Sequence, residues 1–154
     1  MYKKTLVPLD RSQAAESILP HVIELAKPRG ADKCEVVLLN VCEVSLVPEY
    51  YLSEIPLNWK DHVNKCKRSA QQYLAKVEKR LKNAGVSVSS VVLMAKAGEG
   101  NPANYIVDYA NDNDFDLILM STHGRSGLSR WAFGSVADKV MRRVTIPIFL
   151  IRPR

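Results

Sequence analysis

The sequence predicts an α/β fold in which a single domain is built on an open parallel β-sheet with helices on both faces. Five short runs rich in Val, Ile and Leu alternate with stretches that carry apolar residues at helical spacing. Strands that alternate with helices pair in parallel through right-handed crossovers. The length of 154 residues suits one domain with one sizeable core.

The five apolar runs predict strands that are buried on both faces, because they lack the strict alternation of a half-exposed strand. These runs cover residues 5–9, 36–41, 86–94, 117–120 and 146–151. The last run has no later element to cover it, so we expect an exposed edge strand that pairs with a second copy of the chain. Alternatively, this edge does not pair with a second copy, because the residues that follow it, Arg152, Pro153 and Arg154, keep the two copies apart.

The first two helices follow from apolar periodicity. Residues 12–27 place their apolar side chains on one side, and Pro20 within them predicts either a kink or a late helix start. A second apolar stripe extends from Val63 to Leu81 and stops before Gly85, which suits a helix C-cap.

The third helix is predicted to begin at Asn101 and Pro102, an N-cap residue followed by a first-turn proline. A fourth helix is predicted from about residue 135 to residue 143. Residues 43–58 are less regular, and they form either a flap over the ligand-binding edge of the sheet or a simple insertion.

Composition excludes several classes of protein. The net charge is +6, but the basic residues are spread along the chain without interleaved aromatic residues, so no nucleic-acid partner is expected. No apolar run is long enough for a membrane span and no signal-peptide core is present, so we expect a cytoplasmic protein without a membrane partner. Three widely spaced cysteines, Cys34, Cys42 and Cys66, are expected to be reduced and mostly buried thiols.

A glycine-containing stretch, residues 120–136, follows the fourth predicted strand and leads into the fourth helix. Ligands of such sheets bind at the carboxyl ends of the strands. Gly134 and Ser135 at a helix N-terminus would offer unpaired N–H groups, a hydroxyl and the positive end of a helix dipole to an anion. Alternatively, Gly124 and Gly127 only form a tight turn, and Ser135 only caps a helix.

The spacing within this stretch resembles a known signature. The pattern Ser121-x2-Gly124-x9-Gly134-Ser135 is similar to the G-x2-G-x9-G-[S/T] signature of the ATP-binding branch of the universal stress proteins. Neither a G-x-x-x-x-G-K-[ST] loop nor a G-x-G-x-x-G motif after the first strand is present. The segments "THGRSGLSR", "GSVADKV", "IPIFLIR" and "TLVPLDRS" also resemble the family, and the likeness extends over the whole chain.

This resemblance implies a five-stranded, Rossmann-like sheet of order 3-2-1-4-5. It also implies that Asp10 holds the ribose, although Asp10 could instead be a helix N-cap. The main chain of Val41 would read the adenine edge, with Met120 and Val136 as neighbours of the nucleotide.

Gly124, Gly134 and Ser135 match the phosphate cradle of the family. Ser121 occupies a position that is usually glycine, where its side chain either obstructs the ribose mildly or adds a hydrogen bond. Arg125 and Arg130 either neutralise phosphate charge or are solvated surface residues.

The resemblance implies ATP as ligand, with Mg²⁺ or Mn²⁺, and a homodimer formed through the final strand. The expected function is a nucleotide-dependent switch or sensor in the stress response, read by an unknown protein partner, rather than an enzyme. One alternative is a slow ATPase that depends on Asp10 or His123. Another is a family member that binds a different adenine nucleotide, such as a cyclic one, or none, and acts through protein contacts.

Overall fold

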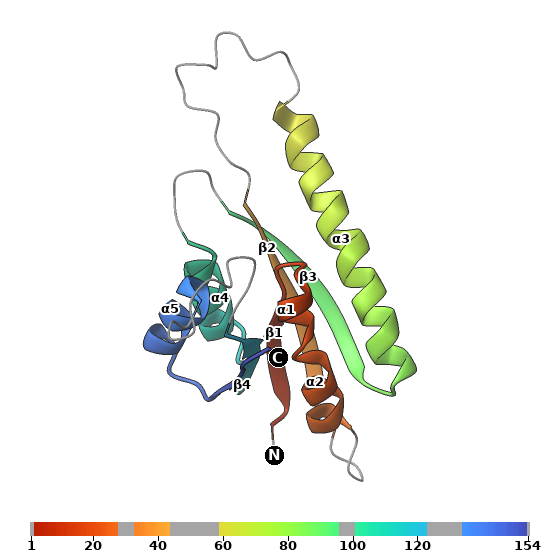
Figure 1. The fold of residues 1–154 in the computed structure, drawn as a ribbon, viewed down its shortest axis with the longest axis vertical. Helices are drawn as coiled ribbons and strands as arrows, with labels where there is room; N and C mark the ends of the chain where they lie inside the picture. Colours follow the sequence, from red (N-terminus) through yellow and green to blue (C-terminus); the bar gives the residue numbers. More distant parts are fainter. Residues whose placement is uncertain (1, 28–32, 44–58, 96–100, 123–133, 154) are drawn as a thin grey trace.

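The computed structural model describes residues 2–27, 33–43, 59–95, 101–122 and 134–153 of the chain (Figure 1). Within these residues the strands and helices alternate, as the sequence predicts. In chain order the elements are β1 (Lys4–Pro8), α1 (Gln13–Glu16), α2 (Leu19–Ala26), β2 (Glu35–Glu43), α3 (Trp59–Asn83), β3 (Ser87–Ala95), α4 (Pro102–Asp112), β4 (Leu117–Ser121), α5 (Ser135–Arg143) and β5 (Ile148–Ile151).

The five strands form one parallel sheet of order β3-β2-β1-β4-β5, which confirms the predicted order. The central strand β1 pairs with β2 on one side and β4 on the other, so that Leu6 lies opposite both Val37 and Ile118. All strands point the same way, and their carboxyl ends therefore meet at one edge of the sheet.

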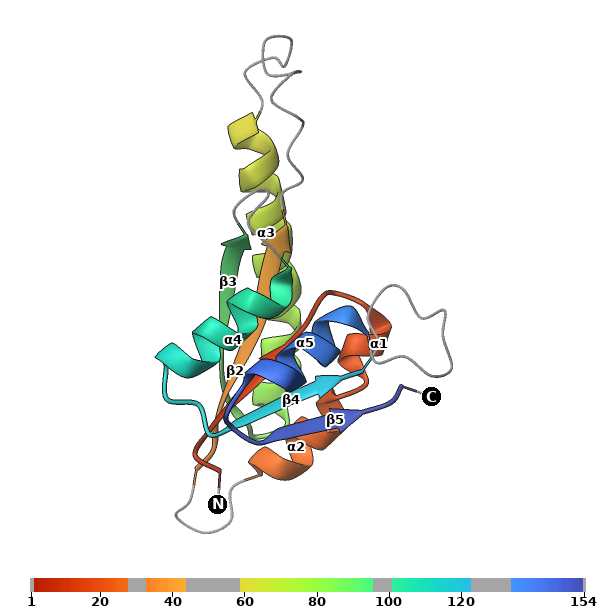
Figure 2. The same ribbon diagram turned by 90° about the vertical axis from the view of Figure 1, so that its left-hand side faces the viewer.

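Helices cover both faces of the sheet (Figures 1 and 2). On one face, α1, α2 and α3 bury a core that includes Val7, Leu38 and Leu74. On the other face, α4 and α5 bury a second core that includes Leu6 and Ile118. Successive residues of a strand point to opposite faces, so one apolar run supplies both cores.

Two strands differ from the expectation of burial on both faces. In β3, Ser87 and Ser89 are exposed and most other residues are half-buried, and in β5 the side chain of Phe149 is 37% exposed. Both strands lie at the edges of the sheet, where fewer neighbours cover them. The prediction is correct for the three inner strands, and for β5 the expectation of an exposed edge is confirmed.

The stretch 12–27 contains two helices rather than one kinked helix. After α1, the chain turns at Ser17 and Ile18, and α2 begins at Leu19 with Pro20 in its first turn. Proline lacks an N–H donor, which costs nothing in the first turn because those donors have no intrahelical acceptor. Pro20 therefore marks a late start of the second helix.

The predicted helix ends are confirmed. At the end of α3, Gly85 has a φ of +82°, and Val86 N–H donates to the carbonyl of Leu81 at 3.0 Å, which is the Schellman arrangement. At the start of α4, the side chain of Asn101 accepts a hydrogen bond from Ala103 N–H at 3.0 Å. α5 begins and ends at the residues that the sequence predicts.

A carboxylate on α3 connects this helix to the edge strand β3. Glu78 accepts hydrogen bonds from the Ser90 hydroxyl at 2.8 Å and from the Lys82 ammonium group at 2.5 Å. These two bonds favour the charged form and lower the pKa of Glu78 below its ordinary value.

We predict that Glu78→Gln makes the stability of the protein less sensitive to acid. Because the folded pKa is lowered, the stabilisation by Glu78 is present at neutral pH and is lost as the pH falls below about 4.5. Urea unfolding should show the variant to be less stable by up to about 1 kcal/mol at pH 7 and no less stable than wild type at pH 3. Glu35→Gln, which changes an exposed carboxylate on β2, should behave as wild type at both pH values. An equal loss at both pH values would contradict this role of Glu78.

Candidate functional site

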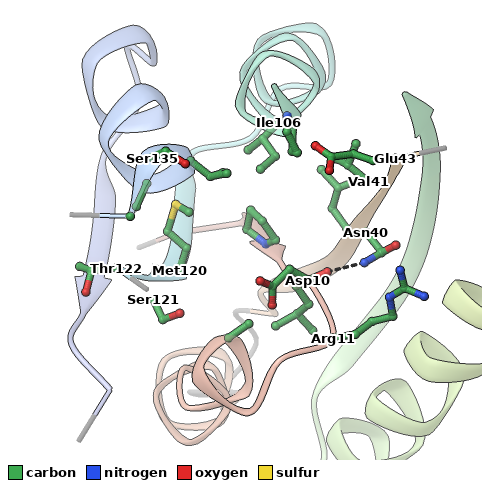
Figure 3. Close-up of a pocket in the computed structure, with 18 residues that line it drawn as sticks. Asp10, Arg11, Asn40, Val41, Glu43, Ile106, Met120, Ser121, Thr122 and Ser135 are labelled. Carbon is green, nitrogen blue, oxygen red and sulfur yellow. Dashed lines mark hydrogen bonds between the residues drawn. The ribbon is translucent and has the colours of Figure 1, made fainter. Parts of the chain in front are cut away.

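A cavity of about 360 Å³ lies at the carboxyl ends of β1, β2 and β4, beneath the first turns of α4 and α5 (Figure 3). Its volume lies in the range of small-molecule sites in proteins. Its wall combines apolar side chains such as Leu39 and Ile106 with polar groups from several strand ends. In an open parallel sheet this is the edge at which ligands bind.

Most of the site residues predicted from the sequence meet in this cavity. Those that line it are Asp10, Val41, Met120, Ser121, Gly134, Ser135 and Val136. Gly124 and Arg125 lie outside the described residues, as do Gly127, Arg130, His123 and most of the irregular segment 43–58. The topology thus brings together residues that are up to 126 positions apart, from Asp10 to Val136.

The N-terminus of α5 forms one side of the cavity. The first helical hydrogen bond of α5 runs from Asp138 N–H to the carbonyl of Gly134 at 2.9 Å. The N–H groups of Ser135, Val136 and Ala137 precede this bond and have no acceptor within the helix. Together with the positive end of the helix dipole, they suit an anionic ligand.

Gly134 itself differs from the expectation that its N–H is unpaired. Its N–H donates to the carbonyl of Thr122 at 2.6 Å, just after the end of β4. This bond fixes the start of α5 against the strand end, so the donors that lack an acceptor within the helix are those of the next three residues. The backbone of Gly134 has φ −53° and ψ 145°, which any residue adopts without strain.

Asp10 is not the helix N-cap that the sequence left open. The cap of α1 is Ser12, whose hydroxyl oxygen accepts a hydrogen bond from Ala15 N–H at 3.0 Å. The Oδ1 atom of Asp10 accepts from the N–H of Ser12 at 3.0 Å and from its hydroxyl at 2.6 Å. In the part of the chain that the structure describes, Oδ2 of Asp10 has no such bond, so this oxygen is available to a ligand.

Sequence reasoning missed four polar residues of the cavity wall, Arg11, Asn40, Glu43 and Thr122. Asn40 and Glu43 stand at the end of β2, and Arg11 follows β1. Their position at or just after the ends of predicted strands was the available signal, because strand ends form this edge of the sheet. Figure 3 shows the carboxyl group of Glu43 pointing into the cavity.

Asn40 is a buried polar residue, 1% exposed, that connects two strand ends. Its Nδ2 donates to the carbonyl of Leu9 at 2.6 Å. Its Oδ1 is buried without a hydrogen-bond partner among the described residues. One satisfied donor therefore joins β2 to the segment that carries Asp10.

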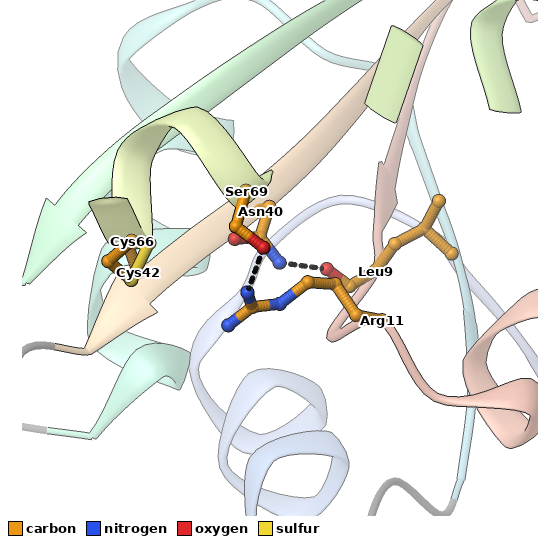
Figure 4. The surroundings of a disulfide bond; sticks show 6 residues. All are labelled: Leu9, Arg11, Asn40, Cys42, Cys66 and Ser69. Atoms are coloured by element: carbon orange, nitrogen blue, oxygen red, sulfur yellow. Dashed lines mark hydrogen bonds between the residues drawn. A yellow bond between two sulfur atoms is a disulfide. The ribbon is translucent and has the colours of Figure 1, made fainter. Parts of the chain in front are cut away.

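Arg11 has a φ of 71°, a left-handed conformation that is unfavourable for residues other than glycine. Its guanidinium group points away from the cavity toward α3, where Nη1 donates to the Ser69 hydroxyl at 3.4 Å (Figures 3 and 4). Strained backbone of this kind is concentrated at functional sites.

The expectation of three reduced cysteines is wrong for two of them. Cys42 on β2 and Cys66 on α3 form a disulfide, with their Cα atoms 6.5 Å apart (Figure 4). The packing of α3 on β2 brings together two residues that are 24 positions apart and share no motif. Cys34 is a buried free thiol as predicted; burial raises its pKa, and its sulfur lies 3.4 Å from the Thr5 hydroxyl.

Among the described residues, no group of three or more His, Cys, Asp or Glu side chains could hold a metal ion. None of the helices in the described ranges is both long enough and apolar enough to cross a membrane.

Comparison with known proteins identifies the family. Residues 1–152 match the universal stress protein family. The chain belongs to this family. Universal stress protein MJ0531 of Methanocaldococcus jannaschii is 30% identical over 152 residues, which cover 99% of this chain and 83% of that protein.

Solved structures of this family have the same fold. The structure of MJ0577, from the same archaeon, superposes with a TM-score of 0.80 at 28% identity, and the match covers 100% of this chain and 98% of that one. An Arabidopsis thaliana family protein with AMP bound has a TM-score of 0.67 at 15% identity, covering 99% and 92% of the two chains. A universal stress protein in complex with cAMP has a TM-score of 0.59 at 16% identity, covering 98% and 97%.

We predict that Asn40→Ala destabilises the protein by about 1–3 kcal/mol, because it leaves the buried Leu9 carbonyl without its donor. Urea unfolding measures this change. Asn111→Ala, at an exposed position of α4, is the matched control and should change the free energy of unfolding little. Equal stabilities of the two variants would mean that the Asn40 bond does not hold the strand ends together.

Proposed function

We propose that this protein binds ATP in the cavity at the carboxyl ends of the strands and acts as a nucleotide-dependent switch or sensor in the stress response. One observation carries the proposal: the N-terminus of α5 and the free carboxylate oxygen of Asp10 belong to the same cavity wall. The first group suits phosphate, and the second suits the vicinal hydroxyls of a ribose.

The proposed site assigns one part of the nucleotide to each wall. The phosphates lie at Gly134 and Ser135, with Gly124 of the signature and Arg125 of the same stretch completing the cradle. The ribose lies at Asp10 and Ser121.

The adenine lies along the main chain of Val41, with the nucleotide flanked by Met120 and Val136. Val41 and Val136 are half-buried and Met120 is buried, so these side chains offer the apolar surface that a base needs.

A bound Mg²⁺ or Mn²⁺ would neutralise part of the triphosphate charge. Because the described residues hold no cluster of metal-binding side chains, the phosphate oxygens would supply most of its ligands. The part of this chain is to hold the nucleotide, and catalysis is not part of the proposal. Fast phosphoryl transfer relies on metal-holding side chains and on a group that positions the nucleophile.

Relatives with AMP or cAMP bound support an adenine nucleotide as the ligand class. Heat release of ligand from the purified protein, followed by mass spectrometry, distinguishes ATP from AMP or a cyclic species. If no nucleotide is released and none binds in a titration, the proposed ATP binding is wrong, and the protein would act through protein contacts instead.

The proposal includes a homodimer in the cytoplasm, formed through β5, and a protein partner that reads the bound state. β5 pairs with β4 on one side and with no other strand among the described residues, and its Phe149 is 37% exposed. An uncovered edge strand readily adds a strand from a second copy.

We predict that Gly134→Glu abolishes ATP binding and leaves the protein folded. The new carboxylate would stand at the start of α5 and repel phosphate, while the φ of −53° accommodates a side chain. Calorimetric titration should show an affinity loss of at least about 30-fold, or about 2 kcal/mol.

Ala84→Glu, which adds the same side chain at an exposed position after α3, is the control and should bind ATP as wild type does. Unchanged affinity of a folded Gly134→Glu variant would remove α5 from the nucleotide site.

We predict that Phe149→Lys weakens dimerisation, because it places a charge on the exposed side of the edge strand. Sedimentation velocity over a range of concentrations should show a larger monomer fraction than in wild type. Tyr2→Lys, at an equally exposed aromatic position near β1, should not shift the equilibrium. A wild-type protein that stays monomeric at all concentrations would contradict the proposed dimer.

A further inference from the structure

The disulfide lies directly behind the wall of the cavity. Cys42 is the second-last residue of β2, and it is fully buried where α3 packs on the strand. Its neighbours Val41 and Glu43 both line the cavity. Because side chains alternate along a strand, these neighbours face the cavity while Cys42 faces α3. The bond to Cys66 therefore attaches α3 to the back of the cavity wall (Figure 4).

A second contact connects the same part of α3 to the cavity. Ser69 lies one helical turn after Cys66 and accepts the hydrogen bond from Arg11, whose preceding residue is Asp10. This bond is long, at 3.4 Å, and it lies at the surface. Nearby, Nε of Arg11 and Oδ1 of Asn40 are buried without partners in the described part of the chain. The polar contacts between α3 and the strand ends are thus incomplete, and the covalent bond is the stronger attachment.

The two cysteines differ in accessibility. The side chain of Cys42 is 0% exposed, whereas Cys66 on α3 is only partly buried. Cys66 is therefore the more accessible member of the pair. This asymmetry is that of a reversible redox pair, in which an accessible thiol reacts first and a buried neighbour resolves the product.

We propose that Cys42 and Cys66 form a reversible thiol–disulfide site that responds to peroxides and controls the cavity through α3. The thiolate of Cys66 attacks one peroxide oxygen, the O–O bond breaks, and hydroxide leaves and is protonated to water. The Cys42 thiol then loses its proton, and the resulting thiolate attacks the sulfur of the Cys66 sulfenic acid. The S–S bond forms, the S–O bond breaks, and a second hydroxide leaves and takes up a proton to become water. Two thiols lose two electrons and one peroxide gains them.

The reverse reaction uses a dithiol reductant. Its thiolate attacks the sulfur of Cys66 to form a mixed disulfide, and the Cys42 thiolate leaves and takes up a proton. The second reductant thiol loses its proton and attacks the reductant sulfur of this mixed disulfide. The Cys66 thiolate then leaves and takes up a proton, and the reductant departs as an intramolecular disulfide. Oxidation joins α3 covalently to the end of β2, and reduction leaves the Ser69–Arg11 bond and the apolar packing of the helix. The sulfur chemistry is independent of nucleotide binding, whereas its effect on ATP affinity rests on the proposed function.

The first experiment follows the thiols. The full chain is reduced, treated with hydrogen peroxide, unfolded and alkylated, and its mass is measured. Oxidised protein should carry one alkyl group, on Cys34, and reduced protein should carry three. In Cys42→Ala, a sulfenic acid should persist on Cys66 and be trapped by dimedone. In Cys66→Ser, Cys42 should stay unreacted in the folded protein.

Cys34→Ala is the matched control, because it removes a buried cysteine outside the pair, and it should oxidise as wild type does. Circular dichroism checks that each variant is folded. A pair that fails to oxidise in the folded protein, or a bond that dithiol reductants cannot open without unfolding it, would overturn the proposal.

The second experiment reads the cavity without a ligand. Amide hydrogen exchange of residues 10–12 and 40–43 should be faster in reduced than in oxidised wild type, and it should not respond to peroxide in Cys66→Ser. Identical exchange in the two redox states would overturn control of the cavity.

ATP titration is the third readout, and oxidation should raise affinity by at least about fivefold in wild type and in Cys34→Ala. If neither redox state binds ATP but amide hydrogen exchange still depends on the redox state, the proposed function is contradicted and the redox site is supported. Equal ATP affinity in the two states would overturn control of nucleotide binding by this pair.

Discussion

Parallel pairing of β1 with β2 on one side and β4 on the other is the constraint from which the site follows. The registers Leu6↔Val37 and Leu6↔Ile118 align three strands, so that their carboxyl ends stop at the same edge. The chain leaves β1 toward helices on one face and leaves β4 toward a helix on the other. Between these diverging connections a cavity remains, which is the general position of ligands in open parallel sheets.

At the end of β2, one face of the strand lines the cavity and the other face contacts α3. Val41 and Glu43 line the cavity, while Cys42 between them points toward α3. Only the thickness of one strand therefore separates α3 from the cavity. The alternation of side chains that builds two cores in the middle of the sheet also places α3 directly behind the candidate site at its end.

Hydrogen bonds between strand ends position the polar groups of the site. The bond from Gly134 N–H to the Thr122 carbonyl sets where α5 begins, and thereby aims its free N–H groups. Asp10 uses one carboxylate oxygen to hold Ser12, the cap of α1, which fixes the direction of the other oxygen. Of the signature that resembles the universal stress protein family, the described residues Ser121, Gly134 and Ser135 lie at these strand and helix ends.

The sequence by itself determined the type and order of the elements and most of the helix ends. Such features depend on a few neighbouring residues. Asn101 caps α4 with its own side chain, and Gly85 adopts a left-handed backbone conformation after α3 without strain. The strand order came from the family resemblance, and the same resemblance gave part of the cavity wall but not Arg11, Asn40 or Glu43. The predicted wall residues can be located from the sequence because they lie near the end of a strand or the start of a helix.

Only the tertiary structure decided the contacts between distant segments. The Cys42–Cys66 bond, the Asn40 contact with Leu9, the orientation of Arg11 toward Ser69 and the pairing of Gly134 N–H have no local signal. Each depends on the distance at which one element packs on another. Periodicity predicts which face of a helix or strand is buried, but it does not specify which residue of another element lies opposite.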